Sequence, residues 1–306
     1  FIRVFFEREE LMHKRKLFAA GAFLVSAIFL VIPFYEKVTL VSRKGKAFGN
    51  LERRVEDYIN QAQGDFSILI KDLNYPEFKI VLKEKEKFAA ASLIKVPLAA
   101  VALKAVREGK LSLSQKITIK RKDITGGSGI IKGMQLPVSL SLQETLELMI
   151  ARSDNTATNK IIGILGFEYI NESFKDLGLS RTTLTRKMMD FYSRKKGVEN
   201  YTTALDLCLI FERIYKGLLI DKEASELLLS FLKKQKVNDR LPRYLAKGLS
   251  VAHKTGLEKG VVHDAGIIFS PKGDYVICVL ARGVGNYKQV KKFIAKLSLL
   301  TYNFYQ

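Results

Sequence analysis

The sequence predicts an α+β domain that follows a single membrane-spanning helix. Apolar segments with strand character lie near both ends of residues 49–306, and helical patterns fill the sequence between them. Before this region, the run Leu17–Phe34 holds eighteen residues without a charge. Strands at the two ends of a domain, with helices between them, favour one sheet to which both ends contribute.

The composition is that of a globular protein with a basic surface. Hydrophobic residues make up 47% and charged residues 27% of the 306 residues, which excludes disordered and fibrous classes. The net charge of +20 predicts attraction to anionic surfaces. The basic residues are spread along the chain and no nucleic-acid-binding motif is present, so no nucleic acid partner is expected. Two cysteines and three histidines exclude a disulfide framework and disfavour a metal site, and no cofactor is expected.

The amino end predicts a membrane anchor. The run Leu17–Phe34 is at the short end of the length that crosses ~30 Å of hydrocarbon, and no small-residue cleavage site follows it. Because Lys14–Lys16 directly precede the run, residues 1–16 are expected in the cytoplasm. Residues 35–48 then form a linker, and residues 49–306 form a catalytic domain outside the cytoplasm. A cleaved signal peptide and a buried helix are the alternatives.

The first half of the domain is expected to begin with a helix. Residues 51–63 show amphipathic helical periodicity. Two strands, Phe66–Leu73 and Phe78–Lys83, are expected around the turn Asn74–Pro76. The long apolar run Leu93–Glu108 predicts a buried helix, and a glycine-rich loop follows it.

The second half of the domain predicts helices that give way to strands. The expected helices are Leu142–Ala151, Thr156–Leu165, 202–215 and 222–235. The expected strands are Val251–Thr255, Val261–Ser270 and Tyr275–Arg282, followed by a closing helix over Tyr287–Tyr302.

A serine and a lysine at the start of the Leu93–Glu108 helix suit nucleophilic catalysis. Ser92 and Lys95 are three residues apart, so they share one helix face. Burial or a nearby cation would lower the pKa of the lysine and let it accept the serine proton. The pairs Ser193–Lys196 and Ser230–Lys233 have the same spacing, but only Ser92 follows small residues and precedes an apolar helix.

Two further motifs carry polar groups suited to acyl chemistry. In the loop Ser153–Asp154–Asn155, a hydroxyl can relay a proton and a carboxamide can hold a substrate amide. In Lys254–Thr255–Gly256, an amine and a hydroxyl beside a glycine suit recognition of a carboxylate.

The three motifs occur in the order Ser92, Ser153, Lys254. Ser153 is 61 residues after Ser92, and Lys254 is 101 residues after Ser153. With Gly126–Gly129 and His263–Gly266, they make residues 49–306 resemble the class A β-lactamase-like family of penicillin-recognising serine hydrolases. The resemblance implies the β-lactamase/D,D-peptidase-like fold, in which helices and an all-helical lobe flank an antiparallel sheet.

The same resemblance implies an acyl-enzyme mechanism. Ser92 would attack a β-lactam or D-Ala-D-Ala carbonyl, and Lys95 would accept its proton. Ser153 would pass a proton to the leaving nitrogen, while Lys254 would lower the pKa of Lys95.

Substrate binding is implied for four more positions. Asn155 would hold the substrate side-chain amide, and Thr255 would bind the substrate carboxylate together with the lysine before it. Gly256 would let the substrate backbone approach, and the backbone N–H of Leu257 would complete an oxyanion hole with that of Ser92.

One departure concerns the water-activating glutamate of class A β-lactamases. Aligning Arg186 with the arginine that precedes this glutamate places Met188 at its position. A thioether cannot act as a general base. Asp190 or Glu199 replaces it only if the register of the loop shifts.

These departures favour the penicillin-binding D,D-peptidase branch of the family. The acid that usually pairs with the arginine falls near Asn200, and a carboxylate-binding arginine is replaced near Ala265. The expected partners are peptidoglycan stem peptides and β-lactams. A true β-lactamase and a catalytically degraded cell-envelope binding protein are the alternatives, and the oligomeric state is left open.

Other patterns are weaker. The glycines of Gly127–Gly133 are not followed by the lysine and hydroxyl of a phosphate loop. His263 and Asp264 are adjacent on an expected strand, so their side chains face opposite sides and form no triad. Cys208 and Cys278 lie in apolar segments and are expected in the core.

Overall fold

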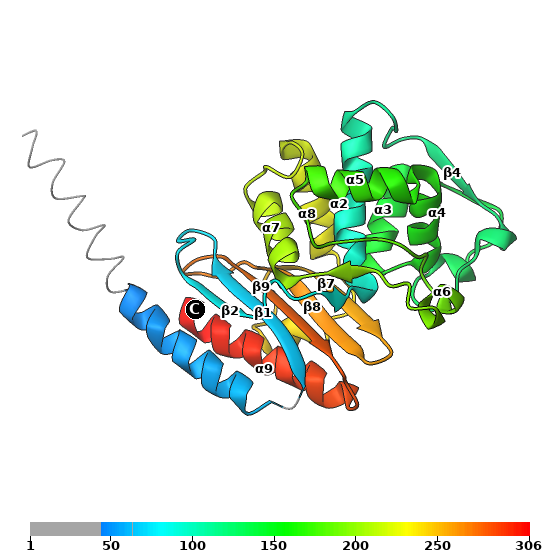
Figure 1. Cartoon of the computed structure of the whole chain (residues 1–306). Coiled ribbons are helices and arrows are strands. Elements are labelled where there is room, and N and C mark those ends of the chain that lie inside the picture. The colour runs from blue at the N-terminus through cyan, green and yellow to red at the C-terminus, as the bar shows by residue number, and fades with distance from the viewer. Residues whose placement is uncertain (1–43, 63) are drawn as a thin grey trace, which may run out of the picture. The chain divides into compact units, whose positions relative to one another are not determined.

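A five-stranded antiparallel sheet and a lobe of helices make up residues 54–306, which form one compact unit (Figure 1). The computed structural model describes residues 44–62 and 64–306. The predicted tail and the Leu17–Phe34 anchor lie outside these residues, as does most of the linker. A helix covers residues 44–60, earlier than the predicted start at residue 51. Across residues 44–62 and 64–306, no helix is both long enough and apolar enough to cross a membrane.

The sheet joins the two ends of the domain, as predicted. Its order is β2-β1-β9-β8-β7, and every neighbouring pair is antiparallel. The strands are β1 (Asp65–Asp72), β2 (Lys79–Leu82), β7 (Val251–Glu258), β8 (Val261–Ile268) and β9 (Tyr275–Arg282). The first strand therefore pairs with the last along its whole length, from Asp65 opposite Arg282 to Asp72 opposite Tyr275.

Helices cover both faces of the central strands. Strand β8 is buried at every residue and β9 at all but its last, so neither shows the alternation of a half-exposed strand. The C-terminal helix α9 (Tyr287–Tyr305) packs on one face and α7 (Ala204–Tyr215) on the other. On the α9 side, the ring of Tyr58 stacks on Phe293 with centroids 5.0 Å apart.

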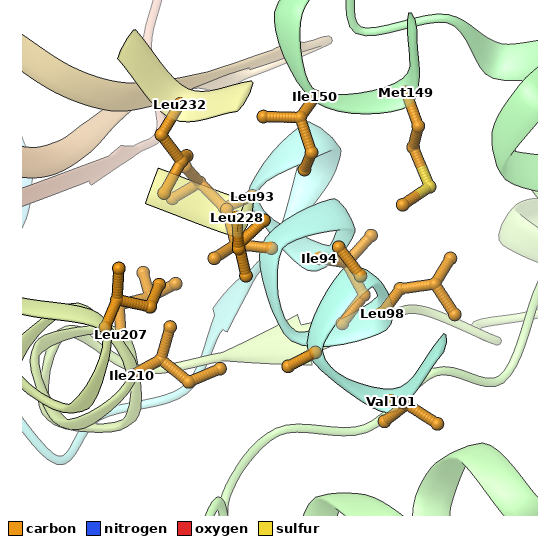
Figure 2. Close-up of a cluster of buried hydrophobic side chains, with 14 of the residues drawn as sticks. Leu93, Ile94, Leu98, Val101, Met149, Ile150, Leu207, Ile210, Leu228 and Leu232 are labelled. Atoms are coloured by element: carbon orange, nitrogen blue, oxygen red, sulfur yellow. The ribbon is translucent and has the colours of Figure 1, made fainter. Parts of the chain in front are cut away.

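The helical lobe is built around α2 (Lys95–Arg107), which is preceded by a 3-10 turn, η1 (Ala91–Ile94). Small and branched residues of this segment are buried on nearly every side, which lets four helices approach it. Apolar side chains of η1 and α2 meet those of α3, α7 and α8 in Figure 2: Leu93, Ile94, Leu98, Val101, Met149, Ile150, Leu207, Ile210, Leu228 and Leu232. The other helices of the lobe are α3 (Leu142–Ala151), α4 (Asn155–Leu165), α5 (Phe167–Asp176) and α8 (Lys222–Lys233).

Most of these helices start at a polar residue whose side chain accepts a backbone N–H. Such N-caps satisfy orphan donors of the first turn and contribute ~1 kcal/mol each. The caps are Ser141 for α3, Asp154 for α4, Thr203 for α7, Asp221 for α8 and Asn286 for α9. They account for why the predicted starts of these five helices fall within two residues of the observed ones.

Some elements were not predicted. Helix α5 follows α4 after the single residue Gly166, whose φ of 75° lets the chain turn sharply. The hairpin β4 (Lys116–Ile119) with β5 (Val138–Ser141) closes an eighteen-residue loop, so it lacks a local turn signal. The short pair β3 (Phe88–Ala89) and β6 (Tyr201–Thr202), and helix α6 (Phe191–Lys195), were also missed.

Candidate active site

Ser92 lies in the 3-10 turn that links the sheet side of the domain to helix α2. The residue before it, Ala91, has φ +44°, a left-handed conformation that costs free energy for a residue with a Cβ. Leu93 and Ile94 are buried in the core and hold the turn in place. Ser92 itself is half-buried and lines a pocket.

Lys95 is completely buried, although it carries an amine. Its Nζ donates to the Ser153 carbonyl oxygen at 2.7 Å and to Asn155 Oδ1 at 2.8 Å, and it lies 3.1 Å from Ser153 Oγ. Burial, and secondarily the charge of Lys254, hold the pKa of Lys95 well below its ordinary value of 10.5. This shift favours the neutral amine, which can accept a proton.

Ser153 connects the two lysines of the site. It sits between α3 and α4 with φ +53°, and its Oγ lies within 3.1 Å of Lys95 Nζ and accepts from Lys254 Nζ at 3.0 Å. The pKa of Lys254 is lowered to about 7, mainly by burial; the charge of Asp264 opposes the change, and that of Arg240 adds to it. The structure thus places the three predicted polar motifs in one hydrogen-bonded chain.

Asn155 and Asp154 fix the glycine-rich loop against α4. Asn155 Nδ2 donates to the Gly126 carbonyl at 2.9 Å. Asp154 Oδ2 accepts from the backbone N–H groups of Ile130 and Ile131 at 2.7 and 2.9 Å. At Gly129, φ is +120° and an added Cβ would lie 2.2 Å from Asp154 Oδ2, so only glycine fits. The sequence marked Asp154 only as part of a motif and gave no sign of this role.

The third motif lies in the middle of β7, because the strand runs three residues beyond its predicted end. Thr255 is buried opposite Asp264, whereas Leu257 is half exposed and lines the pocket. The predicted role of Gly256 in substrate approach stays a prediction, and the fold gives a separate reason for a glycine here. A Cβ there would come within 3.0 Å of the His263 ring on β8, so the glycine makes room for a neighbouring side chain.

His263 and Asp264 point to opposite faces of β8 and serve separate contacts. The Ala281 N–H donates to His263 Nδ1 at 3.1 Å, which leaves Nε2 to donate to the Ala89 carbonyl at 2.8 Å. Burial lowers the pKa of His263 to about 4, so the ring is neutral. Ala89 ends β3 just before the 3-10 turn that holds Ser92, which we call the nucleophile turn. The bond from His263 therefore ties the nucleophile turn to the sheet. Asp264 instead accepts from Leu241 N–H at 3.0 Å and lies 2.9 Å from His253 Nδ1.

The pocket at Ser92 has a volume of about 330 Å³. Apolar side chains of the loop over residues 186–199 form much of its wall. Met188, Met189 and Phe191 line it together with Leu257. The backbone of Met188 is held on both sides by Asn159, which accepts its N–H at 2.8 Å and donates to its carbonyl at 3.1 Å. These bonds fix Met188, a thioether residue, in the wall of the pocket.

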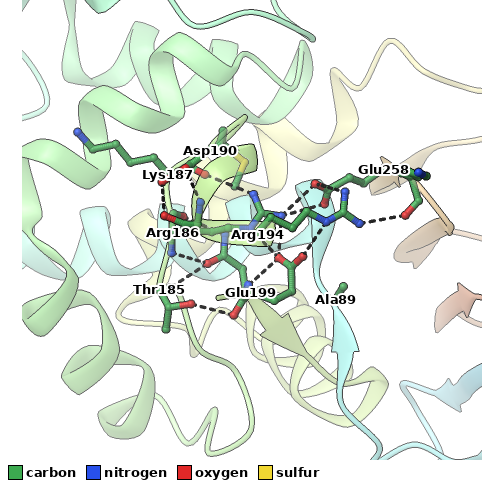
Figure 3. Close-up of polar contacts among 12 residues, drawn as sticks. Ala89, Thr185, Arg186, Lys187, Asp190, Arg194, Glu199 and Glu258 are labelled. Carbon is green, nitrogen blue, oxygen red and sulfur yellow. Dashed lines mark hydrogen bonds and ion pairs between the residues drawn. The ribbon is translucent and has the colours of Figure 1, made fainter. Parts of the chain in front are cut away.

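Four charged residues tie this loop to the end of β7 (Figure 3). Arg186 is only 3% exposed; its Nη2 lies 2.7 Å from Glu199 Oε1 and donates to Glu258 Oε1 at 3.0 Å. Arg194 Nη1 lies 3.0 Å from the same Glu258 oxygen, and its Nε is 3.4 Å from Glu199 Oε2. We refer to Arg186, Arg194, Glu199 and Glu258 as the ion cluster.

The two acids that could replace a water-activating glutamate are both engaged elsewhere. Glu199 belongs to the ion cluster. Asp190 caps α6 by accepting from the Ser193 N–H at 3.0 Å and its hydroxyl at 2.7 Å. Neither lines the pocket that contains Ser92.

Arg240 is a feature that sequence reasoning missed. It is 1% exposed, precedes the 3-10 turn η4 (Leu241–Tyr244), and bonds to Asp239 Oδ1 at 2.9 Å. Its Nε is buried without a hydrogen-bond partner among the described residues, and its charge lowers the pKa of Lys254. In a chain with 51 basic residues, no local pattern distinguishes this arginine.

The cysteines are buried, as expected. Burial raises the pKa of the Cys208 thiol to about 12 and that of Cys278 well above its ordinary value. Thiols in this state are poor nucleophiles.

Comparisons with known proteins agree with this geometry. The sequence model of the beta-lactamase enzyme family matches residues 50–305. A beta-lactamase of Phocaeicola vulgatus is 24% identical over 95% of this chain and 96% of its own length.

Among solved structures, PBP-A is 29% identical with a TM-score of 0.75, covering 83% of this chain and 95% of its own. A mutant of PBP-A with the same identity and TM-score is an acyl-enzyme complex with penicillin G. A beta-lactamase of Sphaerobacter thermophilus is 27% identical with a TM-score of 0.73, covering 85% of this chain and 95% of its own.

Proposed function

The chain belongs to the beta-lactamase enzyme family and is a class A β-lactamase-like serine hydrolase, and from this premise we propose that it is a penicillin-binding D,D-peptidase. In this proposal Ser92 is acylated by D-Ala-D-Ala-type peptidoglycan peptides and by penicillins, and the penicilloyl group is released slowly. The proposal rests on one observation: Met188 and Ser92 line the same pocket. Met188 aligns with the position at which class A β-lactamases are expected to hold a glutamate.

Acylation uses three groups that are hydrogen-bonded to one another, of which Lys95 is one helical turn from Ser92. Lys95 takes the hydroxyl proton, because burial lowers its pKa and so favours the neutral amine that a base requires. Ser153, within hydrogen-bonding distance of both buried lysines, passes a proton to the leaving nitrogen. Lys254 and the buried guanidinium of Arg240 supply positive charge for the carboxylate of the leaving group.

Deacylation needs a base that activates water beside the acyl-enzyme. Among the described residues lining the pocket, the only carboxylate is that of Glu258, and two arginines hold it. These ion pairs occupy the oxygens of Glu258, so the carboxylate is not free to orient a water at the acyl group. Slow release of penicillin follows from this arrangement.

A true β-lactamase is the second candidate. The curated relatives of Phocaeicola vulgatus and Proteus vulgaris carry that name, and the acylation groups are the same for both activities. This candidate requires a water-activating group other than Asp190 and Glu199, since hydrogen bonds and ion pairs hold both.

We also propose that Leu17–Phe34 anchors the enzyme in the cell membrane with its catalytic domain outside the cytoplasm. The uncharged run and the preceding Lys14–Lys16 support this orientation. Protease added to intact spheroplasts should degrade the catalytic domain. Protection until the membrane is lysed would contradict the proposed orientation.

The test is the intact mass of the full chain in mild detergent, followed over time after excess benzylpenicillin. A persistent adduct of one penicillin, absent in Ser92→Ala, is expected. Release of D-alanine from a diacetyl-Lys-D-Ala-D-Ala peptide should depend on Ser92 as well. Unmodified protein with hydrolysed penicillin would favour the β-lactamase. No adduct, intact penicillin and no D-alanine release would favour a degraded binding protein.

A further inference from the structure

The ion cluster places two guanidinium groups and one carboxylate in the wall of the substrate pocket. Arg186, Arg194 and Glu258 all line the pocket that contains Ser92. Glu258 contacts both arginines, through Oε1 and Oε2 to Arg186 at 3.0 and 3.1 Å and through Oε1 to Arg194 at 3.0 Å. Glu199 supplies the second negative charge from outside the pocket wall. The four charges therefore cancel.

The position of the cluster indicates which part of a substrate it meets. A carbonyl attacked by Ser92 has the leaving group on one side and the acyl substituent on the other. The buried amine of Lys254 and the buried guanidinium of Arg240 suit the carboxylate of the leaving group. The acyl substituent is then directed toward the loop wall, where Met188 and Phe191 lie beside the cluster.

Resting on the proposed function, we propose that Glu258 determines the acyl-group specificity of this site. By neutralising the two arginines, it lets the pocket take uncharged, apolar acyl substituents. Without its charge, an unbalanced guanidinium would face the substituent and attract anionic ones. Lys259 also lines the pocket, but it is exposed, so solvent screens its charge.

Benzylpenicillin and carbenicillin test this inference, because they differ by one carboxylate on the acyl side chain. The measurement is the ratio of their second-order acylation rate constants, carbenicillin over benzylpenicillin, on the full chain in detergent. Glu258→Gln should raise this ratio roughly tenfold at low salt, the size expected for one unit charge in a partly solvated pocket. This increase in the ratio should be smaller in 1 M NaCl, because the Debye length falls to ~3 Å and the charge on the pocket wall is screened from the substituent.

Matched variants separate charge from folding. Glu258→Asp keeps the charge and should keep the wild-type ratio, whereas Arg194→Gln removes a cation and should lower it. Glu226→Gln makes the same charge change on α8, at an exposed residue outside the pocket lining, and should leave the ratio unchanged. If Glu258→Gln does not fold, the opposite shift in Arg194→Gln still tests the inference.

The outcomes distinguish the inference from its premise. A ratio in Glu258→Gln within twofold of wild type, or an equal shift in Glu258→Asp, would overturn the specificity role while leaving acylation at Ser92 intact. Absence of any adduct on the wild type would refute the proposed function and the inference with it.

Discussion

Replacing Lys254 by Met should stabilise the protein at neutral pH while abolishing acylation. Lys254 is fully buried, and its pKa falls from 10.5 to about 7, so the unfolded chain binds a proton that the native state binds weakly. At pH 7 this difference destabilises the native state by ~4 kcal/mol. Met has a similar length and no charge to bury.

The variant also loses two hydrogen bonds. Lys254 Nζ donates at 3.0 Å to Ser153 Oγ and at 3.0 Å to the Thr255 carbonyl, and losing each bond costs ~1 kcal/mol. The net expectation at pH 7 is a gain of ~2 kcal/mol, within the range seen when apolar residues replace buried charges.

The dependence on pH makes this prediction sharp. Between pH 7 and 10.5 the wild-type unfolding free energy rises with pH, because only the unfolded chain still releases this proton. The advantage of Lys254→Met should therefore fall by ~1.4 kcal/mol per pH unit and reverse near pH ~9.

The assay is urea denaturation of both proteins followed by circular dichroism, since the chain has no tryptophan to report unfolding. Mass spectrometry after benzylpenicillin checks that acylation is lost. A Lys254→Met protein that is less stable than wild type at pH 7, or a difference that does not change with pH, would refute the reasoning.

Three further changes test other contacts. Met188→Glu places a carboxylate in the wall of the pocket that contains Ser92 and should shorten the lifetime of the penicillin adduct ~100-fold, the lower end of the range for general base catalysis; an unchanged lifetime in the mass assay would argue against this position for the base. His263→Leu removes the hydrogen bonds to the Ala89 carbonyl and from the Ala281 N–H and should cost about 2 kcal/mol in a denaturation assay. Because the pKa of His263 is about 4, the wild-type unfolding free energy should fall as pH drops from 6.5 to 4, and a similar slope in the variant would contradict this origin. Gly266→Ala puts a Cβ 2.4 Å from the Ala252 carbonyl oxygen and should lower the melting temperature by well over ~4 °C, whereas Gly163→Ala, with open space around it, should not lower it.

Much of the fold could be predicted because its helices and strands carry their own signals. The caps Ser141 and Asp154, and the apolar runs of β8 and β9, are visible locally, and pairing of the two chain ends follows from their order. The hairpin of β4 and β5 has no such signal, since its strands are joined by a long loop. Helix α5 has amphipathic periodicity and was missed although that signal was present.

The site shows the same division. Ser92, Lys95 and Lys254 stand out by motif, and the structure brings two of them within reach of Ser153. Arg240 and Glu258 could not be recognised, because their importance comes from contacts with elements distant in sequence. The bond from His263 to the Ala89 carbonyl spans 174 residues and has no local pattern at either end. The catalytic roles of Ser92, Lys95 and Lys254 stay predictions.

The pairing of β1 with β9 constrains how the chain can fold. Asp65 lies opposite Arg282, so the sheet cannot close until nearly the whole domain has been synthesised. Until then β1 and β8 each present an unpaired edge, which favours association with other chains. Contacts between residues so far apart in sequence also slow folding. A nascent chain that stops before residue 275 would therefore hold the nucleophile turn and its helices without the strand that joins the two halves of the sheet.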